Sequence, residues 1–333
     1  MRLSLERERG VAIRAVIAAS NLCSRVRNSM ADGSTMVKGD RSPVTIADFG
    51  SQAVVCRILK EAFPADPIVA EEDSRELARP ENEEILREVV RHVQETIDGA
   101  SPKQVCSWID LGRQNPAQRF WTLDPIDGTK GFLRGDQYAI ALALIEDGEV
   151  RLGVLGCPNL SVAAHHRKKN KGAVFMALRG RGAVQNDLKR KTRKSIAVSQ
   201  VANPSEARFT ESFESAHSDQ TSHQRVARRL GIGASPLRMD SQAKYAVLAR
   251  GDASLYLRLP SPATPDYRER IWDHAAGSII IEEAGGRVTD AYGRDLDFSE
   301  GSRLERNRGI VATNGLLHDA VLNAVRFELM GDR

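Results

Sequence analysis

A pair of acids in the sequence joins the end of an apolar strand to a tightly defined turn. The strand-like stretch Phe120–Leu123 runs into Asp124-Pro-Ile-Asp127-Gly-Thr129. Proline fixes one backbone torsion and glycine permits an otherwise costly turn, so both carboxylates can face one point in space. A helix starting at Gly128 would add free amides that form an anion site. Asp-Pro and Asp-Gly are each common turn dipeptides, but the full hexamer is much rarer, which favours a functional interpretation.

Two further acidic elements have a similar character. Glu71-Glu72-Asp73 ends the apolar stretch Ile68–Ala70, and three adjacent anions repel each other unless a cation or solvent compensates. Asp273 begins an apolar helix, where an acid is also a common N-cap. In isolation, a solvated turn explains the first element and a cap explains the second equally well.

Taken together, these acids supply only oxygen ligands, because no motif among them contains a cysteine or a histidine pair. Hard oxygen ligands suit magnesium or manganese rather than zinc. A magnesium site lined by carboxylates usually acts on phosphate, where two or three ions neutralise the phosphoryl group and lower the pKa of a bound water.

The spacing of apolar residues predicts an α+β first half and an α/β second half. Helices are expected at Glu6–Met30, Thr45–Ala62 and Asn82–Ile97. An antiparallel meander is expected at Phe120–Leu123, Ala139–Glu146, Val150–Cys157, Ser161–His165 and Ala173–Leu178. Strands and helices then alternate at Ser195–Val198, Gln220–Leu230, Gln242–Ala249, Ala253–Leu259, Trp272–Ala284 and Leu316–Glu328. We therefore divide the chain into residues 1–190 and 191–333.

The bulk composition argues against several classes of protein. The formal charge is +4 with basic and acidic residues mostly interleaved, so nothing demands a nucleic-acid polymer as partner. The apolar stretches fall far short of the roughly 18–20 residues that cross a bilayer, and the N-terminus is unlike a targeting peptide. The four cysteines form no CxxC pair and are interpreted as reduced thiols. We expect a cytoplasmic monomer without a membrane partner.

These motifs resemble, in type and in order, the signatures of the inositol monophosphatase superfamily. The match rests on Glu71-Glu72, on the hexamer from Asp124, on the stretch Trp272–Gly277 and on Glu283-Ala-Gly-Gly286, and it spans nearly the whole chain. The resemblance implies an α/β/α/β/α layered fold, with an antiparallel sheet in the first half and metal ions between the halves. Asp73 departs from the more usual serine, and the region 74–106 matches the smaller members poorly.

The resemblance also implies roles for individual residues. One magnesium would be held by Glu71, Asp124 and the carbonyl of Ile126, and a second by Asp124, Asp127 and Asp273. Asp48 and Thr129 would orient and deprotonate the attacking water, while the amides of Gly128 and Thr129 would bind the phosphate. Inhibition by lithium is expected, because family members share a metal site that this ion can enter.

Within the superfamily, longer stretches are similar to the 3′(2′),5′-bisphosphate nucleotidases. That similarity implies that Ser241, Lys244 and Arg258 contact the nucleotide and its 5′-phosphate, with His217 near the adenine. The implied reaction removes the 3′-phosphate of adenosine 3′,5′-bisphosphate, and the sulfated analogue is a second expected substrate. Two alternatives stay open: a phosphatase of the same fold acting on inositol phosphates or fructose 1,6-bisphosphate, and a catalytically silent metal or nucleotide sensor.

Overall fold

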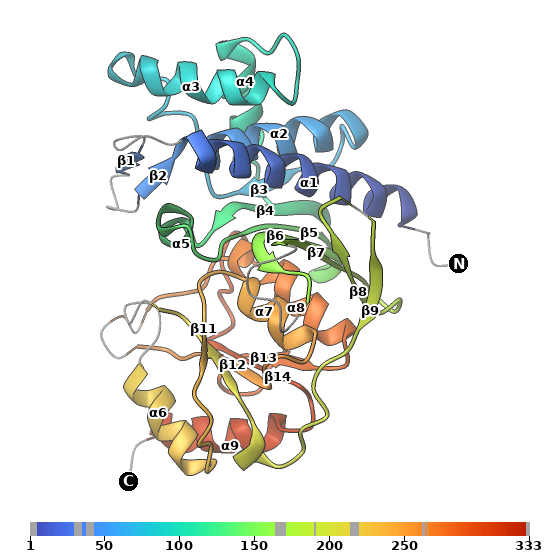
Figure 1. The fold of residues 1–333 in the computed structure, drawn as a ribbon, viewed down its shortest axis with the longest axis vertical. Helices are drawn as coiled ribbons and strands as arrows, with labels where there is room; N and C mark the ends of the chain where they lie inside the picture. Colours follow the sequence, from blue (N-terminus) through green and yellow to red (C-terminus); the bar gives the residue numbers. More distant parts are fainter. Residues whose placement is uncertain are drawn as a thin grey trace.

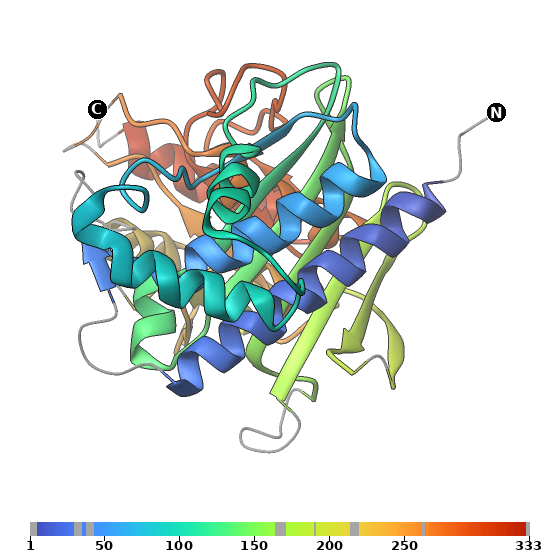
Figure 2. The same ribbon diagram turned by 90° about the horizontal axis from the view of Figure 1, so that it is seen from above.

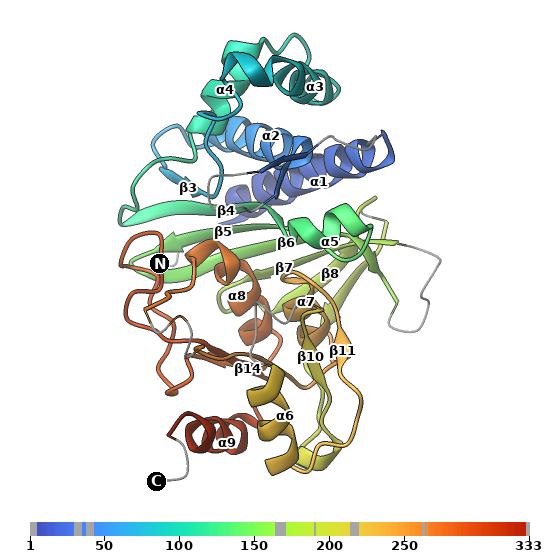
Figure 3. The same ribbon diagram turned by 90° about the vertical axis from the view of Figure 1, so that its left-hand side faces the viewer.

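The computed structural model describes residues 5–29, 35–37, 43–163, 171–189, 191–213, 220–261, 264 and 266–330. These residues form layers in which helices alternate with two β-sheets, and this confirms the expected α/β/α/β/α fold (Figures 1 and 3). Within the described ranges, no helix is both long enough and apolar enough to cross a membrane.

The first helical layer covers one face of the first sheet. Its helices are α1 (Glu6–Ser29) and α2 (Ile46–Ala62), and α3 (Glu83–Gln94) and α4 (Pro102–Asp110) pack against them on the outside, with a short 3-10 helix, η1 (Pro80–Asn82), before α3 (Figure 1). Figure 2 shows α1 and α2 side by side above the strands. The two short strands β1 (Thr35–Val37) and β2 (Pro43–Thr45) pair with each other before α2. The helices expected at 6–30, 45–62 and 82–97 are thereby confirmed.

The first sheet contains the expected antiparallel meander and extends beyond it at both edges. Its order is β3 (Ile68–Ala70), β4 (Arg119–Asp127), β5 (Ala139–Glu146), β6 (Glu149–Ser161), β7 (Lys171–Leu178), β8 (Ala183–Asp187) and β9 (Arg193–Ile196). The meander covers β4 to β7, strand β3 pairs parallel to β4 at one edge, and β8 and β9 extend the sheet at the other. The separate strand expected at 161–165 is wrong in its described part, because Ser161 is the last residue of β6 and a bend follows. Residues 164 and 165 lie outside the described residues.

The second half contains the remaining layers. Its sheet has the order β11 (Leu237–Arg238), β10 (Phe209–Glu211), β12 (Leu255–Arg258), β14 (Ile310–Thr313) and β13 (Arg287–Thr289). Helices α7 (Ala243–Ala249) and α8 (Ala275–Glu283) lie between the sheets (Figure 3). The 3-10 helix η4 (Ile271–Asp273) comes immediately before α8. Helices α6 (Gln220–Arg229) and α9 (His318–Met330) cover the outer face. A further 3-10 helix, η2 (Pro204–Glu206), precedes β10.

The strand expected at 195–198 falls elsewhere than predicted. It is β9, which pairs with β8 and so belongs to the first sheet rather than to the second half. The boundary between residues 190 and 191 remains a prediction.

Side chains of β5 alternate in size as well as in direction. Ile140, Leu142 and Leu144 join the core beneath α1 and α2, whereas the alanines between them join the core beneath α7 and α8. On β6, a Cβ at Gly153 would lie 2.5 Å from Ile279 Cγ2 and 2.7 Å from the Ala276 carbonyl oxygen. The small residues therefore let α8 pack close against the first sheet, which places the start of α8 near the end of β4.

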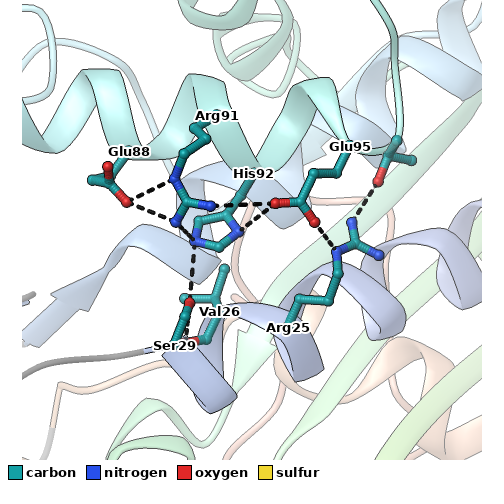
Figure 4. A network of polar contacts seen from close by, with 8 residues as sticks. Arg25, Val26, Ser29, Glu88, Arg91, His92 and Glu95 are labelled. Carbon is teal, nitrogen blue, oxygen red and sulfur yellow. Dashed lines mark hydrogen bonds and ion pairs between the residues drawn. The ribbon is translucent and has the colours of Figure 1, made fainter.

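Polar contacts fasten the region 74–106 to α1, as Figure 4 shows. The buried His92 lies on the face of α3 that meets α1. Arg25 Nε is 2.7 Å from Glu95 Oε2, and Arg25 Nη2 donates to Thr96 Oγ1 at 2.9 Å. Helix α4 begins with a reciprocal cap between Ser101 and Gln104. This region therefore forms an outer helical layer.

Candidate active site

Two acids emerge side by side from the parallel strands β3 and β4. Ala70 pairs with Leu123, so Glu71 and Asp124 are the next residues on neighbouring strands. The pairing of β4 with β5 then shifts register between Asp124 and Asp127. Asp273 comes from η4 in the other half. The charges of Glu71, Asp127, Asp273 and Asp48 all act on Asp124, so the structure brings the predicted acids together.

The part of the site that contains these acids disfavours their negative charge. Burial, followed by the neighbouring acids, raises the pKa of Asp124 well above its usual value. Burial also raises the pKa of Asp127 and of Asp273, although Lys244 and Arg258 respectively act in the opposite direction. Among the described residues, the Oδ1 atom of Asp124 is buried without a hydrogen-bond partner. A hard divalent cation would relieve both features, so the residues present fit one.

Helix α2 holds both acidic loops in place. Ser51 Oγ donates to the Pro125 carbonyl oxygen at 2.8 Å. Gln52 Nε2 donates to the Glu72 carbonyl oxygen at 2.6 Å, and the Glu72 amide donates back to Gln52 Oε1 at 3.0 Å. Asp48 lies one turn earlier on the same helix and is 1% exposed. The predicted base is therefore presented beside the loops that carry the predicted metal ligands.

The turn after Asp127 depends on a glycine. Gly128 has φ +84°, and a Cβ there would lie 2.9 Å from Ser241 Cβ. A larger residue would thus be strained and would push the two halves apart. The short helix α5 (Thr129–Arg134) follows, and Thr129 Oγ1 donates to the Ile126 carbonyl oxygen at 3.2 Å.

A second turn, from the other half, meets this one. Ser241 is a non-glycine residue with φ +68°, a conformation that the surrounding contacts must stabilise. The amide of the next residue, Gln242, donates to Asp127 Oδ2 at 2.5 Å. The Gln242 side chain also donates to the Trp272 carbonyl oxygen at 2.9 Å and accepts from the Gly277 amide at 3.0 Å. Gln242 therefore links the predicted ligand Asp127 to the start of α8, a role that the sequence did not indicate.

Two cations lie on the side of the site that is nearer the second sheet: Lys244 is buried, and the Arg258 side chain is 19% exposed. Lys244 is 5% exposed, and burial lowers its pKa to about 8, with Asp127 acting in the opposite direction. Arg258 Nε lies 2.9 Å from Glu269 Oε2, and Arg258 Nη1 lies 3.8 Å from Asp273 Oδ2. Burial opposes the charge of Arg258, but the surrounding acids, led by Glu269, raise its pKa well above its usual value.

Glu269 and His274 complete this side. Glu269 Oε2 lies 3.3 Å from His274 Nε2, and His274 Nδ1 lies 2.7 Å from the Tyr245 hydroxyl. Burial alone would raise the pKa of Glu269, but Arg258 and His274 lower it. Burial lowers the pKa of His274. Sequence reasoning gave Glu269 no role, because its contact with Arg258 is made by the tertiary fold.

The structure thus gathers Ser241, Lys244 and Arg258 near the acids, and their contacts with a nucleotide stay predictions. His217 lies outside the described residues. The roles of Asp48, Thr129, Gly128 and the individual metal ligands stay predictions.

Comparison with known proteins finds relatives that match over nearly the whole chain. A relative from Oryza sativa named 3′(2′),5′-bisphosphate nucleotidase is 48% identical, over 96% of this chain and 93% of its own length. Relatives of the same name from Schizosaccharomyces pombe and Emericella nidulans are 44% and 43% identical, each over 97% of this chain and over 96% and 99% of their own lengths.

Solved structures share the fold at low sequence identity. The suhB protein of Bartonella henselae has a TM-score of 0.66 at 20% identity, over 95% of this chain and 97% of its own. An inositol monophosphatase from Thermotoga maritima has a TM-score of 0.65 at 22% identity, over 96% of both chains. The model of the inositol monophosphatase family matches residues 5–330, and the chain belongs to that family, whose catalysis depends on metal.

Proposed function

We propose that this chain is a 3′(2′),5′-bisphosphate nucleotidase that hydrolyses the 3′-phosphate of adenosine 3′,5′-bisphosphate to give AMP and phosphate. The observation that carries the proposal is that two cations face the acids: Arg258 Nη1 lies 3.8 Å from Asp273 Oδ2, and Lys244 and Arg258 both oppose the rise that burial causes in the pKa of Asp127. In a substrate with two phosphates, the acids would hold the metal ions that act on one phosphate, and the cations would bind the other. The relatives at 43–48% identity, which bear this name over nearly their full length, support the same activity.

On this proposal, magnesium is the metal and the acids hold two or three ions. Glu71, Asp124 and the Ile126 carbonyl would hold one, and Asp124, Asp127 and Asp273 a second. When bound, the ions supply charge neutralisation at the phosphoryl group and a water of lowered pKa. The buried Asp124 Oδ1, without a partner among the described residues, is the atom that most needs such a ligand.

The chain's own residues supply orientation and proton transfer. Asp48, held in the first turn of α2, would take the proton of the attacking water, with Thr129 orienting that water. The amides of Gly128 and Thr129 would bind the phosphate that leaves. On the opposite side, Lys244 and Arg258 would bind the remaining 5′-phosphate, and Ser241 the nucleoside. His217 stays a predicted contact of the adenine. A monomeric state and a cytoplasmic location also stay predictions.

Phosphate release from a small substrate panel tests this proposal. Adenosine 3′,5′-bisphosphate, its 5′-phosphosulfate analogue, inositol 1-phosphate and fructose 1,6-bisphosphate are compared with and without magnesium. We expect the highest kcat/KM for the adenosine bisphosphate, strict dependence on magnesium and inhibition by millimolar lithium. Lys244→Met should reduce kcat/KM for the nucleotide more than for inositol 1-phosphate. If inositol 1-phosphate is the best substrate and its kcat/KM is unchanged in Lys244→Met, the inositol phosphatase alternative holds. If no substrate releases phosphate, the silent-sensor alternative holds.

A further inference from the structure

One buried carboxylate, Glu269, touches both the second sheet and the start of α8. Its side chain is 9% exposed and lies just before η4. Its Oε2 atom is 2.9 Å from Arg258 Nε on β12 and 3.3 Å from His274 Nε2 at the start of α8. Glu269 is therefore placed to fix the position of the Arg258 side chain relative to η4, which carries Asp273.

The contacts continue from His274 into α7. His274 Nδ1 lies 2.7 Å from the Tyr245 hydroxyl. The Tyr245 ring packs edge to face on Tyr256 at 5.2 Å, and Lys244 Nζ lies 5.4 Å from the centre of the Tyr256 ring. Lys244 and Arg258, the two proposed phosphate-binding cations, thus both contact residues of this one network. Glu269 is the acid in it that lies closest to Arg258.

A cation site is the first alternative for this cluster, because Glu269, Asp273 and His274 offer donor atoms within 4.8 Å of one another. The contacts argue against it. The Arg258 guanidinium already lies 2.9 Å from Glu269 and 3.8 Å from Asp273, and it would repel a second cation placed there. Both imidazole nitrogens of His274 also face partners. The cluster is an ion-pair network centred on Arg258.

The geometry of the pair decides what Glu269 can do. Its contact with Arg258 is through Nε, which restrains the plane of the guanidinium. Among the described residues, the terminal nitrogens Nη1 and Nη2 make longer contacts, 3.8 Å to Asp273 Oδ2 and 3.4 Å to the Tyr267 hydroxyl. A guanidinium restrained at Nε presents both terminal nitrogens to a phosphate, with less rotamer entropy to lose on binding.

We propose that Glu269 is a positioning residue that holds Arg258 toward the phosphate that is not hydrolysed, and so sets the preference for a bisphosphorylated nucleotide. This inference rests on the proposed function, in which Arg258 binds the 5′-phosphate.

The test compares adenosine 3′,5′-bisphosphate with adenosine 3′-monophosphate, which lacks the 5′-phosphate. In Glu269→Gln and Glu269→Ala, we expect KM for the bisphosphate to rise about tenfold with kcat little changed. KM for the monophosphate should stay at the wild-type value. In the double variant Glu269→Ala with Arg258→Lys, discrimination between the substrates should fall no further than in Arg258→Lys alone, because Glu269 acts through Arg258.

The matched control is Glu328→Gln. Glu328 Oε1 accepts from Arg225 Nε at 2.6 Å, in a similar ion pair between α9 and α6 on the far side of the second sheet (Figure 1). This substitution should leave discrimination unchanged. The Gln variant at 269 keeps the side-chain shape, so it reports on positioning even if the Ala variant fails to fold.

Two different failures can be told apart. If Arg258→Lys lowers discrimination but the Glu269 variants do not, or if they impair both substrates equally, the positioning role of Glu269 is overturned while the proposed function stands. If Arg258→Lys itself leaves discrimination unchanged, the assignment of Arg258 to the 5′-phosphate fails, and the inference fails with it.

Discussion

On the first-sheet side of the candidate site, burial and neighbouring acids work against the charge of Asp124, whereas on the second-sheet side Arg258 and Glu269 lie within 2.9 Å of each other. The first side keeps a buried carboxylate oxygen without a partner among the described residues. On the second side, Glu269 balances the charge of Arg258 within the chain itself.

The acidic side needs a bound cation to balance its charge, whereas the Arg258–Glu269 ion pair is already formed when the chain folds. Crowded carboxylates destabilise the metal-free chain but create affinity for a divalent ion, since the ion removes their repulsion. A balanced ion pair is already in its binding geometry before any ligand arrives, although removing one member leaves the other buried and unpaired. Substitutions on the two sides should therefore separate activity from stability.

The largest effect is expected for Asp124→Asn. Phosphate release should fall by about a thousandfold, because the neutral amide removes an anionic ligand and places N–H donors where a cation would bind. Removing one of several crowded charges should at the same time leave the melting temperature in chelator equal to or above that of the wild type. Asp273→Asn should behave alike in activity.

The control for Asp124→Asn is Asp66→Asn, at the opposite end of β3. Asp66 Oδ2 accepts from Arg119 Nε at 2.9 Å and from Trp121 Nε1 at 3.0 Å, so this substitution should cost stability but not turnover. Near wild-type turnover of Asp124→Asn at saturating magnesium would contradict the ligand assignment.

Arg258→Met should have the next largest effect, on stability. The free energy of unfolding should fall by about 3 kcal/mol, because Glu269 is left buried without its counter-charge. Arg87→Met is the control: Arg87 Nη2 is 3.2 Å from Glu83 Oε1, and the two side chains are 70% and 76% exposed, so neither is left buried and unpaired. Urea denaturation should show a loss below about 1 kcal/mol there. Equal losses in both variants would remove the distinction between the two sides.

Magnesium itself should stabilise the protein through the acidic side alone. At a concentration 100 times Kd, the expected gain in unfolding free energy is about 2.7 kcal/mol. Thermal melts with and without magnesium should show this gain in the wild type and in Arg87→Met, and a much smaller one in Asp124→Asn. A shift of equal size in Asp124→Asn would mean that the ion binds elsewhere.

The same contrast explains how far the sequence could predict the site. The acidic side is encoded in short contiguous motifs that end strands, so Glu71, Asp124 and Asp127 were identified from local sequence. Gln242 was not assigned a role, because its contact is with Asp127, 115 residues earlier in the chain. Glu269 was missed for a related reason: its partner Arg258 lies on β12, and the tertiary fold decides that they meet.

Elements of the fold were missed for different physical reasons. Strand β14 lies between β12 and β13 and is buried at every residue, so it shows no alternation of polar and apolar side chains. Helix α4 did carry a local signal, the Ser101–Gln104 capping box with Pro102 after it, which could have been recognised. The long helices and the meander strands β4 to β7 have clear periodicity, and they were predicted, whereas β8 (Ala183–Asp187) was not.

A buried histidine with neutral partners lies between the two cases and should give the smallest effect. His318, 1% exposed at the start of α9, lies 3.1 Å from Thr289 Oγ1 and 3.0 Å from Thr313 Oγ1 through its two ring nitrogens. Burial lowers its pKa to about 4, against an ordinary value of 6.5. As pH falls below 6.5 the unfolded chain takes up the proton first, so the stabilisation present at higher pH is lost progressively toward pH 4. The free energy of unfolding should therefore fall more between pH 7.5 and 4.5 for the wild type than for His318→Gln, by roughly 2 kcal/mol. Melting temperatures measured over this pH range should show the steeper fall. Parallel curves would show that the fold tolerates a charged imidazole at this position. Neutral hydrogen bonds would then stabilise a buried charge as well as the ion pair at Arg258 does.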